Sequence, residues 1–171
     1  MDDECERVDQ TVLHVPGVSR GNCFAATVAG LLKIPIESIP QFKTEGDISW
    51  QEQFNGWLRQ FGLAWFPMAG DDLSGECQQL GITGLWSEMS GKSPRFDAGH
   101  SCVAKDGRLA WDPHPEQTGL ERPIWWHGVF IVLRPWDMVH SIPCPPLGMG
   151  PRPQLDGKGW QAAWNKWEAK P

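Results

Sequence analysis

The 171-residue sequence contains no tyrosine, no Cys-x-x-Cys pair and no excess of basic residues. Its 15 lysines and arginines are outnumbered by 21 aspartates and glutamates, which gives a net charge of −6 at pH 7. This acidic balance argues against a nucleic-acid-binding surface. The five cysteines are an odd number at wide spacings, so we expect neither a disulfide framework nor a structural zinc site.

The sequence also lacks long apolar runs. The longest, Phe24–Leu32 and Val129–Leu133, are too short to span a bilayer, and the acidic first residues lack the pattern of a signal peptide. Together with the cysteine usage, these absences predict a cytoplasmic protein that makes no contact with a membrane. No internal repeat is present, and the chain is long enough for one domain with a substantial core.

Helical patterns occupy much of the first half of the chain. They cover residues 23–33, 50–61 and 73–80, with a short helical turn within 34–42. The second pattern is the clearest, because Ser49 and Glu52 form a capping box and Gly62 provides a stop. Aromatic and aliphatic residues recur on one face of this helix, and we interpret them as core packing.

Strand patterns dominate the second half. They are expected over residues 63–68, 82–89, 100–105, 108–112 and 125–134, with loops at 14–21 and 91–99. Asp106-Gly107 is the turn pair of a tight hairpin between the third and fourth of these strands. Helices followed by an antiparallel sheet predict an α+β fold.

Cys23 lies where a Gly-Asn turn meets a helix of small residues. A thiol at a helix N-terminus lies at the positive end of the helix dipole, beside unpaired N–H groups. This position favours the thiolate, which is the form that attacks electrophiles. Cys23 is therefore the candidate nucleophile. The alternative is a small buried helix residue, which is a common role for a free cysteine.

A base and an orienting group for Cys23 are available in the predicted hairpin. His100 opens its first strand and Asp112 closes its second, so the two residues lie on adjacent strands. In regular register Cys102 opposes Trp111, which places Asp112 on the face opposite His100. Their contact therefore requires a bulge or a chain break at Pro113. Once in contact, Asp112 can fix the His100 tautomer, which completes a Cys-His-Asp arrangement.

Each of these residues has an alternative role. His100 could be a strand-end histidine with satisfied hydrogen bonds, and Asp112 could only cap the Asp-Pro turn. His114, between two prolines, is expected to be a rigidly held surface residue that could replace His100. Cys102 shares a face with His100, so it could be a core residue, a redox partner of Cys23 or a metal ligand. A metal site of His100, Cys102, Asp112 and His114 lacks the tighter spacing of zinc sites, and we predict no metal and no cofactor.

Several short motifs, taken as a set, resemble a known family. They are Gly-Asn-Cys-Phe-Ala-Ala, Leu-Leu-x-Ile-Pro, Ile-Pro-x-Phe, Gly-x-Ser-Pro-Arg, His-x-Cys-Val and Trp-Asp-Pro-His-Pro. The chain resembles, over residues 9–135, small papain-like cysteine-peptidase-fold proteins of bacteriophages and prophages. These are distantly similar to the peptidase domains of bacteriocin exporters and to cell-wall cysteine peptidases. The resemblance implies a papain-like α+β fold with Cys23 as nucleophile, His100 as general base and Asp112 as orienting group.

The resemblance also implies an oxyanion-binding donor and a function. Papain-like enzymes place a glutamine upstream of the cysteine; Gln10 is the match, Asn22 is a competitor, and the Cys23 backbone N–H is the second donor. We expect a cysteine hydrolase that cleaves a peptide or isopeptide bond of a protein or peptide substrate. As a phage accessory protein it would act on a host protein, such as a defence component. An inactive papain-like fold that binds and inhibits a host protein is the alternative, and deamidation or acyl transfer also stays open.

The composition changes after the predicted catalytic domain, which spans residues 1–135. Residues 136–158 are rich in proline and glycine and are interpreted as a linker. Residues 159–171 carry Trp160, Trp164 and Trp167 at helical spacing. This stripe predicts a helix docked on the domain or a surface for a protein partner, and a disordered tail is the third interpretation.

Overall fold

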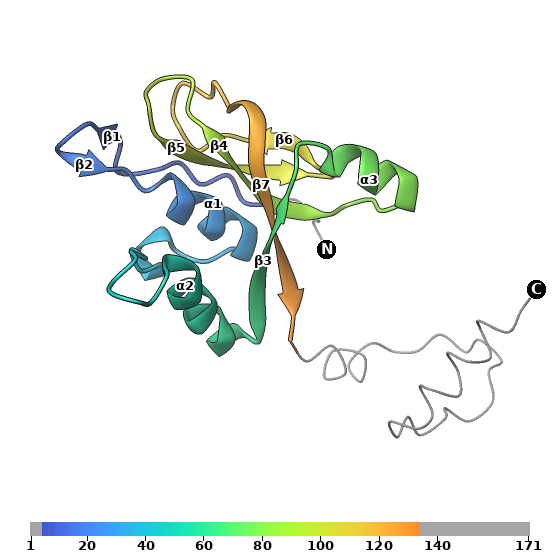
Figure 1. Cartoon of the computed structure of the whole chain (residues 1–171), viewed down its shortest axis with the longest axis horizontal. Coiled ribbons are helices and arrows are strands. Elements are labelled where there is room, and N and C mark those ends of the chain that lie inside the picture. The colour runs from blue at the N-terminus through green and yellow to red at the C-terminus, as the bar shows by residue number, and fades with distance from the viewer. Residues whose placement is uncertain (1–4, 134–171) are drawn as a thin grey trace, which may run out of the picture. The chain divides into compact units, whose positions relative to one another are not determined.

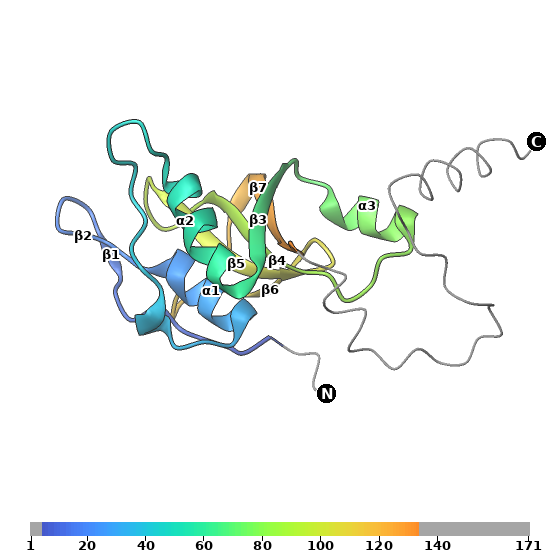
Figure 2. The same ribbon diagram turned by 90° about the horizontal axis from the view of Figure 1, so that it is seen from below.

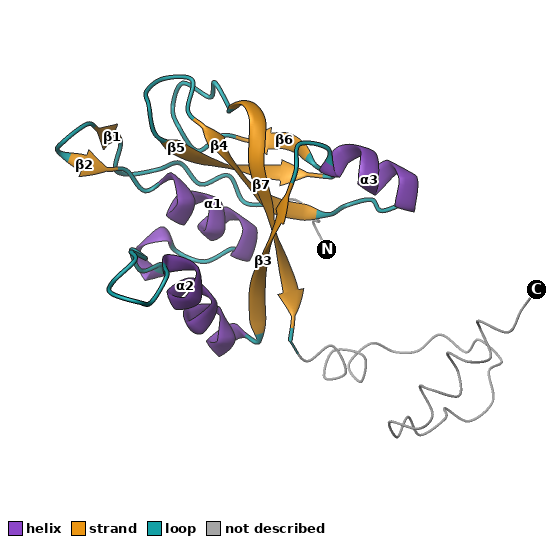
Figure 3. Ribbon diagram, in the orientation of Figure 1, coloured by secondary structure: helices purple, strands orange, loops and turns teal. Residues whose placement is uncertain are grey.

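The computed structural model describes residues 5–133 (Figure 1). The predicted linker over 136–158 and the tryptophan-rich tail over 159–171 lie outside the described residues. Within residues 5–133, helices pack on a five-stranded antiparallel sheet, which confirms the α+β class (Figure 3). None of the helices in this part of the chain combines the length and apolarity that a membrane crossing needs.

Local sequence signals define the helices. They are α1 (Cys23–Leu32), η1 (Ile36–Ser38), α2 (Trp50–Leu58), η2 (Arg59–Phe61) and α3 (Leu73–Leu80). At the start of α2 the predicted capping box is present: Ser49 Oγ accepts from the Glu52 N–H at 3.2 Å, and Glu52 Oε2 accepts from the Ser49 N–H at 3.0 Å. The predictions for α1 and α3 are confirmed to within one residue. The helix predicted over residues 50–61 is α-helical only as far as Leu58 and continues as η2, and the turn within 34–42 is limited to η1.

Seven strands are described. They are β1 (His14–Val15), β2 (Ser19–Arg20), β3 (Leu63–Ala69), β4 (Trp86–Lys92), β5 (Gly99–Lys105), β6 (Arg108–Trp111) and β7 (Glu121–Val132). The main sheet has the order β3-β7-β4-β5-β6, and β1 with β2 forms a small ribbon inside the predicted loop 14–21. The predicted bounds of β4 and β7 were wrong. Pairing of Lys92 with both Gly99 and Glu121 extends these strands beyond their apolar segments.

An aromatic core holds α1 and α2 against the sheet. The two helices lie beside each other on one side of the sheet, and α3 lies at its other end (Figures 1 and 2). Phe54 and Leu58 of α2 are fully buried between Val28 of α1 and Trp65 of β3. The Phe54 ring lies 5.9 Å from the Trp65 ring in an edge-to-face arrangement. This packing confirms the interpretation of the α2 face and fixes the first turn of α1 near β5.

The hairpin of β5 and β6 contains a one-residue bulge. The pairs on its two sides are Ala104–Leu109 and Val103–Trp111. Ala110 is therefore an extra residue in β6. Because successive side chains of a strand point to opposite faces, this one residue brings position 112 onto the face that His100 occupies.

Candidate active site

His100 and Asp112 are in direct contact, and the bulge at Ala110 makes this contact possible. His100 Nε2 lies 2.7 Å from Asp112 Oδ1, and both side chains are buried. The sequence analysis required a bulge or a chain break for this pairing, and the structure contains the bulge. The tautomer of His100 is therefore fixed by a carboxylate, which leaves its other ring nitrogen for a second partner.

Asp112 is held by several further groups. Oδ1 accepts from the His114 backbone N–H at 2.9 Å, Oδ2 accepts from the Gly119 backbone N–H at 2.8 Å, and Arg95 Nη1 lies 3.3 Å from Oδ2. Burial acts to raise the pKa of Asp112, but hydrogen bonds with His100, His114 and Gly119 outweigh it and lower the pKa to about 2. Asp112 caps the turn, as one interpretation proposed, and it binds His100 as well.

The second partner of His100 is Cys23. Burial acts to lower the pKa of His100, but hydrogen bonds with Asp112 and Cys23 outweigh it and raise the pKa from 6.5 to about 9. The imidazole is therefore protonated at neutral pH beside the thiol.

Cys23 is the first residue of α1 and is half-buried. The N-cap residue Asn22 makes no side-chain capping hydrogen bond, and the first turn contains no acidic residue. The N–H groups of this turn therefore have no capping side chain, and the positive end of the helix dipole acts at Cys23. The structure brings the three predicted residues of the triad together.

The two predicted oxyanion donors have different positions. Asn22 lines the cleft beside Cys23, but its side chain binds Val12 N–H and Thr11 Oγ1, each at 2.9 Å. Gln10 is buried outside the cleft lining, and its Nε2 donates to the Val12 carbonyl oxygen at 3.3 Å. Neither side-chain amide donates into the cleft in this arrangement. The oxyanion role of both residues stays a prediction, and the backbone N–H of Cys23 is the donor that the helix start supplies.

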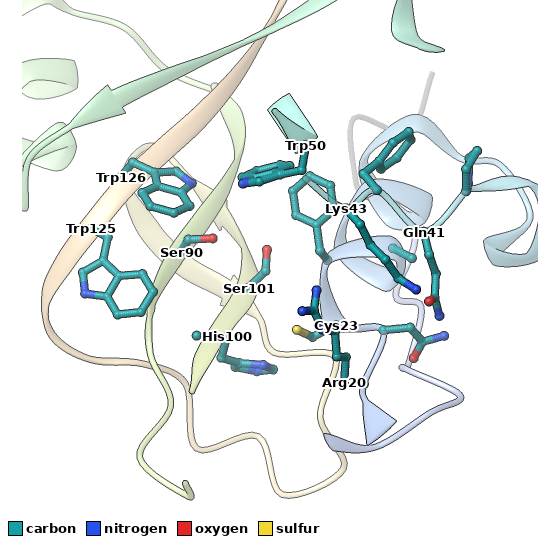
Figure 4. A pocket seen from close by; sticks show the side chains of 17 residues that line it. Arg20, Cys23, Gln41, Lys43, Trp50, Ser90, His100, Ser101, Trp125 and Trp126 are labelled. Atoms are coloured by element: carbon teal, nitrogen blue, oxygen red, sulfur yellow. The ribbon is translucent and has the colours of Figure 1, made fainter. Parts of the chain in front are cut away.

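A cleft of about 370 Å³ opens beside Cys23, and we call it the Cys23 cleft (Figure 4). The helix side is formed by Arg20–Ala25, Pro40–Lys43 and Trp50, and the sheet side by Ser90, Gly99–Ser101, Trp125 and Trp126. Figure 4 shows Cys23 and His100 facing each other across it. The cleft thus gives a substrate access to the thiol between two structured walls.

Cys102 and His114, the two further residues of the possible metal site, are both buried. Cys102 is fully buried on the face of His100, as predicted, and burial raises the pKa of its thiol. Ligand atoms of His100, Cys102 and Asp112 lie within 4.8 Å of one another, but His100 and Asp112 already bind each other. His114 is buried, so its prediction as a surface residue was wrong. Its Nδ1 accepts from the Glu116 N–H at 3.1 Å, which holds the ring inside the turn.

The sequence analysis did not identify two charged residues, Arg95 and Glu88, whose side chains are buried near the candidate site. The Arg95 guanidinium binds Asp112 and Thr118; Arg95 belongs to the Gly-x-Ser-Pro-Arg motif, but its spacing identifies no partner. Glu88 is fully buried in β4. Its carboxylate accepts hydrogen bonds from Ser90, from Ser101 at 2.8 Å and from Trp126 Nε1 at 3.2 Å. The one available signal was that Glu88 is the only charged residue in the predicted strand over residues 82–89.

Burial raises the pKa of Glu88 to about 7, against the opposing effect of its hydrogen bonds with the serines and Trp126. Ser90, Ser101 and Trp126 also line the Cys23 cleft. Glu88 therefore holds part of the sheet wall in place from beneath, without lining the cleft itself.

We compared the chain with family models, with curated proteins and with solved structures, and none of the three comparisons found a match. The family resemblance of the sequence motifs therefore stays a prediction, and the geometry around Cys23 is the basis for a function.

Proposed function

We propose that this protein is a cysteine hydrolase with a papain-like fold that cleaves a peptide or isopeptide bond. One observation carries the proposal: a buried, ionised Asp112 binds His100 at 2.7 Å, and His100 in turn contacts a cysteine at a helix N-terminus. The nucleophile, base and orienting group of a catalytic triad are recognised by such geometry and not by sequence order. The open cleft beside the thiol supplies the space for a substrate.

The first half of the proposed reaction acylates the cysteine. The thiolate sulfur of Cys23 attacks the substrate carbonyl carbon, a C–S bond forms, and the carbonyl electron pair moves to the oxygen. The backbone N–H of Cys23 stabilises this oxyanion. Protonated His100 gives its proton to the leaving nitrogen as the C–N bond breaks, and a thioester and a free amine result.

The second half restores the enzyme. Neutral His100 takes a proton from water, whose oxygen attacks the thioester carbon. The C–S bond then breaks, the carboxylic acid product leaves, and Cys23 is again a thiolate beside protonated His100. Asp112 keeps the ring oriented and stabilises its charge throughout, without accepting the proton itself.

The proposed setting is that of a phage accessory protein in the host cytoplasm, with a host protein as substrate. The resemblance of the sequence motifs supports this setting. Deamidation and acyl transfer use the same acyl-enzyme and differ in the leaving group or the acceptor, so product analysis distinguishes them from hydrolysis.

The proposal is tested by the alkylation rate of Cys23 with iodoacetamide, followed by mass spectrometry, in the wild type and in His100→Gln. At about pH 6, Cys23 of the wild type should react at least about tenfold faster than in His100→Gln, because the thiolate depends on the protonated imidazole. Cys5 is an internal control, since burial raises the pKa of its thiol.

Equal rates at Cys23 and Cys5, or a Cys23 rate that His100→Gln leaves unchanged, would contradict the hydrolase. The alternative function, an inactive fold that binds and inhibits a host protein, would then be favoured. In that case Cys23→Ala should still bind the partner protein.

A further inference from the structure

The Cys23 cleft has a positive lining in a protein of net charge −6. Arg20 and Lys43 line it, and no aspartate or glutamate among residues 5–133 does. Within residues 5–133, neither of these two side chains forms an ion pair with an acidic residue. Two exposed cations that have no acidic partner in the described part of the chain, placed together against the overall charge of the protein, indicate complementarity to an anion.

Both cations lie on the helix side of the cleft, close to the nucleophile. Arg20 is the last residue of β2 and precedes Cys23 by a short turn, and Lys43 belongs to the segment between η1 and α2. Figure 4 shows both on the same side as Cys23, opposite Trp125 and Trp126. The first turn of α1 contains no acidic residue that would offset them. The positive charge is therefore on the same wall of the cleft as the nucleophile.

We infer that the Cys23 cleft takes a substrate that carries a carboxylate close to the scissile bond, with Arg20 and Lys43 as its binding residues. Guanidinium and ammonium groups bind a carboxylate through charge-assisted hydrogen bonds, and the fork of Arg20 suits both oxygens. That the neighbouring bond is cleaved rests on the proposed function, whereas the binding of the carboxylate does not. The carboxylate can belong to an aspartate or glutamate side chain or to a free C-terminus.

The opposite wall fits the remainder of such a substrate. Trp125 and Trp126 line this sheet side of the cleft with large indole surfaces, which favour flat and apolar groups. The carboxylate would be held on the helix side and the apolar part against the indoles. This division gives the substrate a fixed direction across Cys23 and His100.

Two alkylating agents of nearly equal shape test the charge of the cleft at Cys23. Iodoacetate and iodoacetamide both form an S–C bond and release iodide, but only iodoacetate carries a carboxylate. The normalised ratio is the iodoacetate rate divided by the iodoacetamide rate at Cys23, relative to the same quotient for N-acetylcysteine. At low salt this normalised ratio should be at least about 3. Arg20→Gln and Lys43→Gln should each lower this ratio, and added salt should lower it as well.

Arg59→Gln is the matched control for these variants. It removes the same charge from an exposed position in η2 that does not line the cleft, so the ratio should stay unchanged. A normalised ratio of one or less, or an equal decrease in Arg59→Gln, would overturn the inference without affecting the hydrolase proposal.

A binding measurement makes the test independent of thiol reactivity. In Cys23→Ala, NMR titration of the tryptophan indole N–H signals compares Nα-acetylglutamate methylamide with Nα-acetylglutamine methylamide, and N-acetylalanine with its methylamide. The first pair reports a side-chain carboxylate and the second a C-terminal one. Tighter binding of either acidic probe, reduced by Arg20→Gln, supports the inference even if Cys23 is inert and the hydrolase fails. Equal binding of acidic and neutral probes in both pairs overturns it.

Discussion

Nε2 of His100 and Oδ1 of Asp112 lie 2.7 Å apart, although a regular hairpin would direct these two side chains to opposite faces. The pKa values of the pair have moved apart, to about 9 for His100 and about 2 for Asp112. Between these values the pair is a buried cation next to a buried anion. Its response to mutation and to pH follows from that charge state.

Asp112→Asn should lower the pKa of His100 from about 9, because the amide cannot balance the imidazolium charge as a carboxylate does. NMR titration of the His100 ring signals measures this change. His114→Gln is the control, since it removes the neighbouring ring and keeps the His114 backbone N–H that binds Asp112. A His100 pKa that is the same in Asp112→Asn and the wild type would show that the contact carries no charge coupling.

The same pair gives the pH dependence of stability a definite sign. The pKa of His100 is raised above 6.5, so its contribution is fully present below pH 6.5 and is lost as the pH rises through about 9. The pKa of Asp112 is lowered, so its contribution is present above pH 3.8 and is lost as the pH falls through about 2. The difference in unfolding free energy between the wild type and Asp112→Asn should therefore be largest between pH 3.8 and pH 6.5, where both contributions are fully present.

At neutral pH the buried Glu88 should lower the stability of the folded state, whereas the His100–Asp112 pair raises it. Burial raises its pKa from 4.5 to about 7, so the folded state retains a proton that the unfolded state releases, and the contribution of Glu88 to stability falls as the pH rises from 4.5 through 7. The neutral amide in Glu88→Gln removes this dependence. Urea denaturation at several pH values should show stability shifting in favour of Glu88→Gln as the pH rises.

The control for Glu88 is Glu37→Gln, at an exposed position in η1. A free-energy difference between Glu88→Gln and the wild type that stays constant across this pH range would contradict the prediction. A constant offset alone is expected from the exchanged hydrogen bonds with Ser90, Ser101 and Trp126, so the slope with pH is the decisive quantity.

Gly128 in β7 makes room for two side chains of the core. A Cβ at this position would overlap Trp65 Nε1 and lie 2.7 Å from Glu88 Oε2. Gly128→Ala should therefore destabilise the protein by about 1–3 kcal/mol through overpacking. Gly56 in α2 has open space around it, so Gly56→Ala should stabilise by about 0.5–1 kcal/mol. Chemical denaturation of both variants measures the contrast, and equal effects would rule out the tight packing at Gly128.

Those parts of the fold that depend on neighbouring residues could be predicted from the sequence. The start of α2 follows from Ser49 and Glu52, which cap the helix across one turn. The bounds of β4 could not be predicted in this way, because Gly91 and Lys92 become strand only through their partners in β5 and β7. Strand pairing of this kind depends on distant segments that no local pattern identifies.

The candidate site shows the same division. Cys23 is marked by a helix start, and His100 with Asp112 by the ends of a tight hairpin, so these three could be identified. The partners of Arg95 and Glu88 could not, because Arg95 reaches Thr118 and Glu88 reaches Trp126 across intervals that differ in length and pattern. Local spacing therefore identifies the three side chains of the candidate triad better than the residues that hold them.

The bulge at Ala110 has a consequence for how related chains should be compared. Removing Ala110 would let β6 continue in regular register and would leave Trp111 opposite Val103, as it is now. His100 and Asp112 are 12 positions apart, and a chain with one position fewer would present the same two side chains to each other. A sequence search that demands one fixed spacing would miss the hairpins that form this pair with the other spacing. The two permitted spacings differ by one residue, and the bulge is what makes them equivalent.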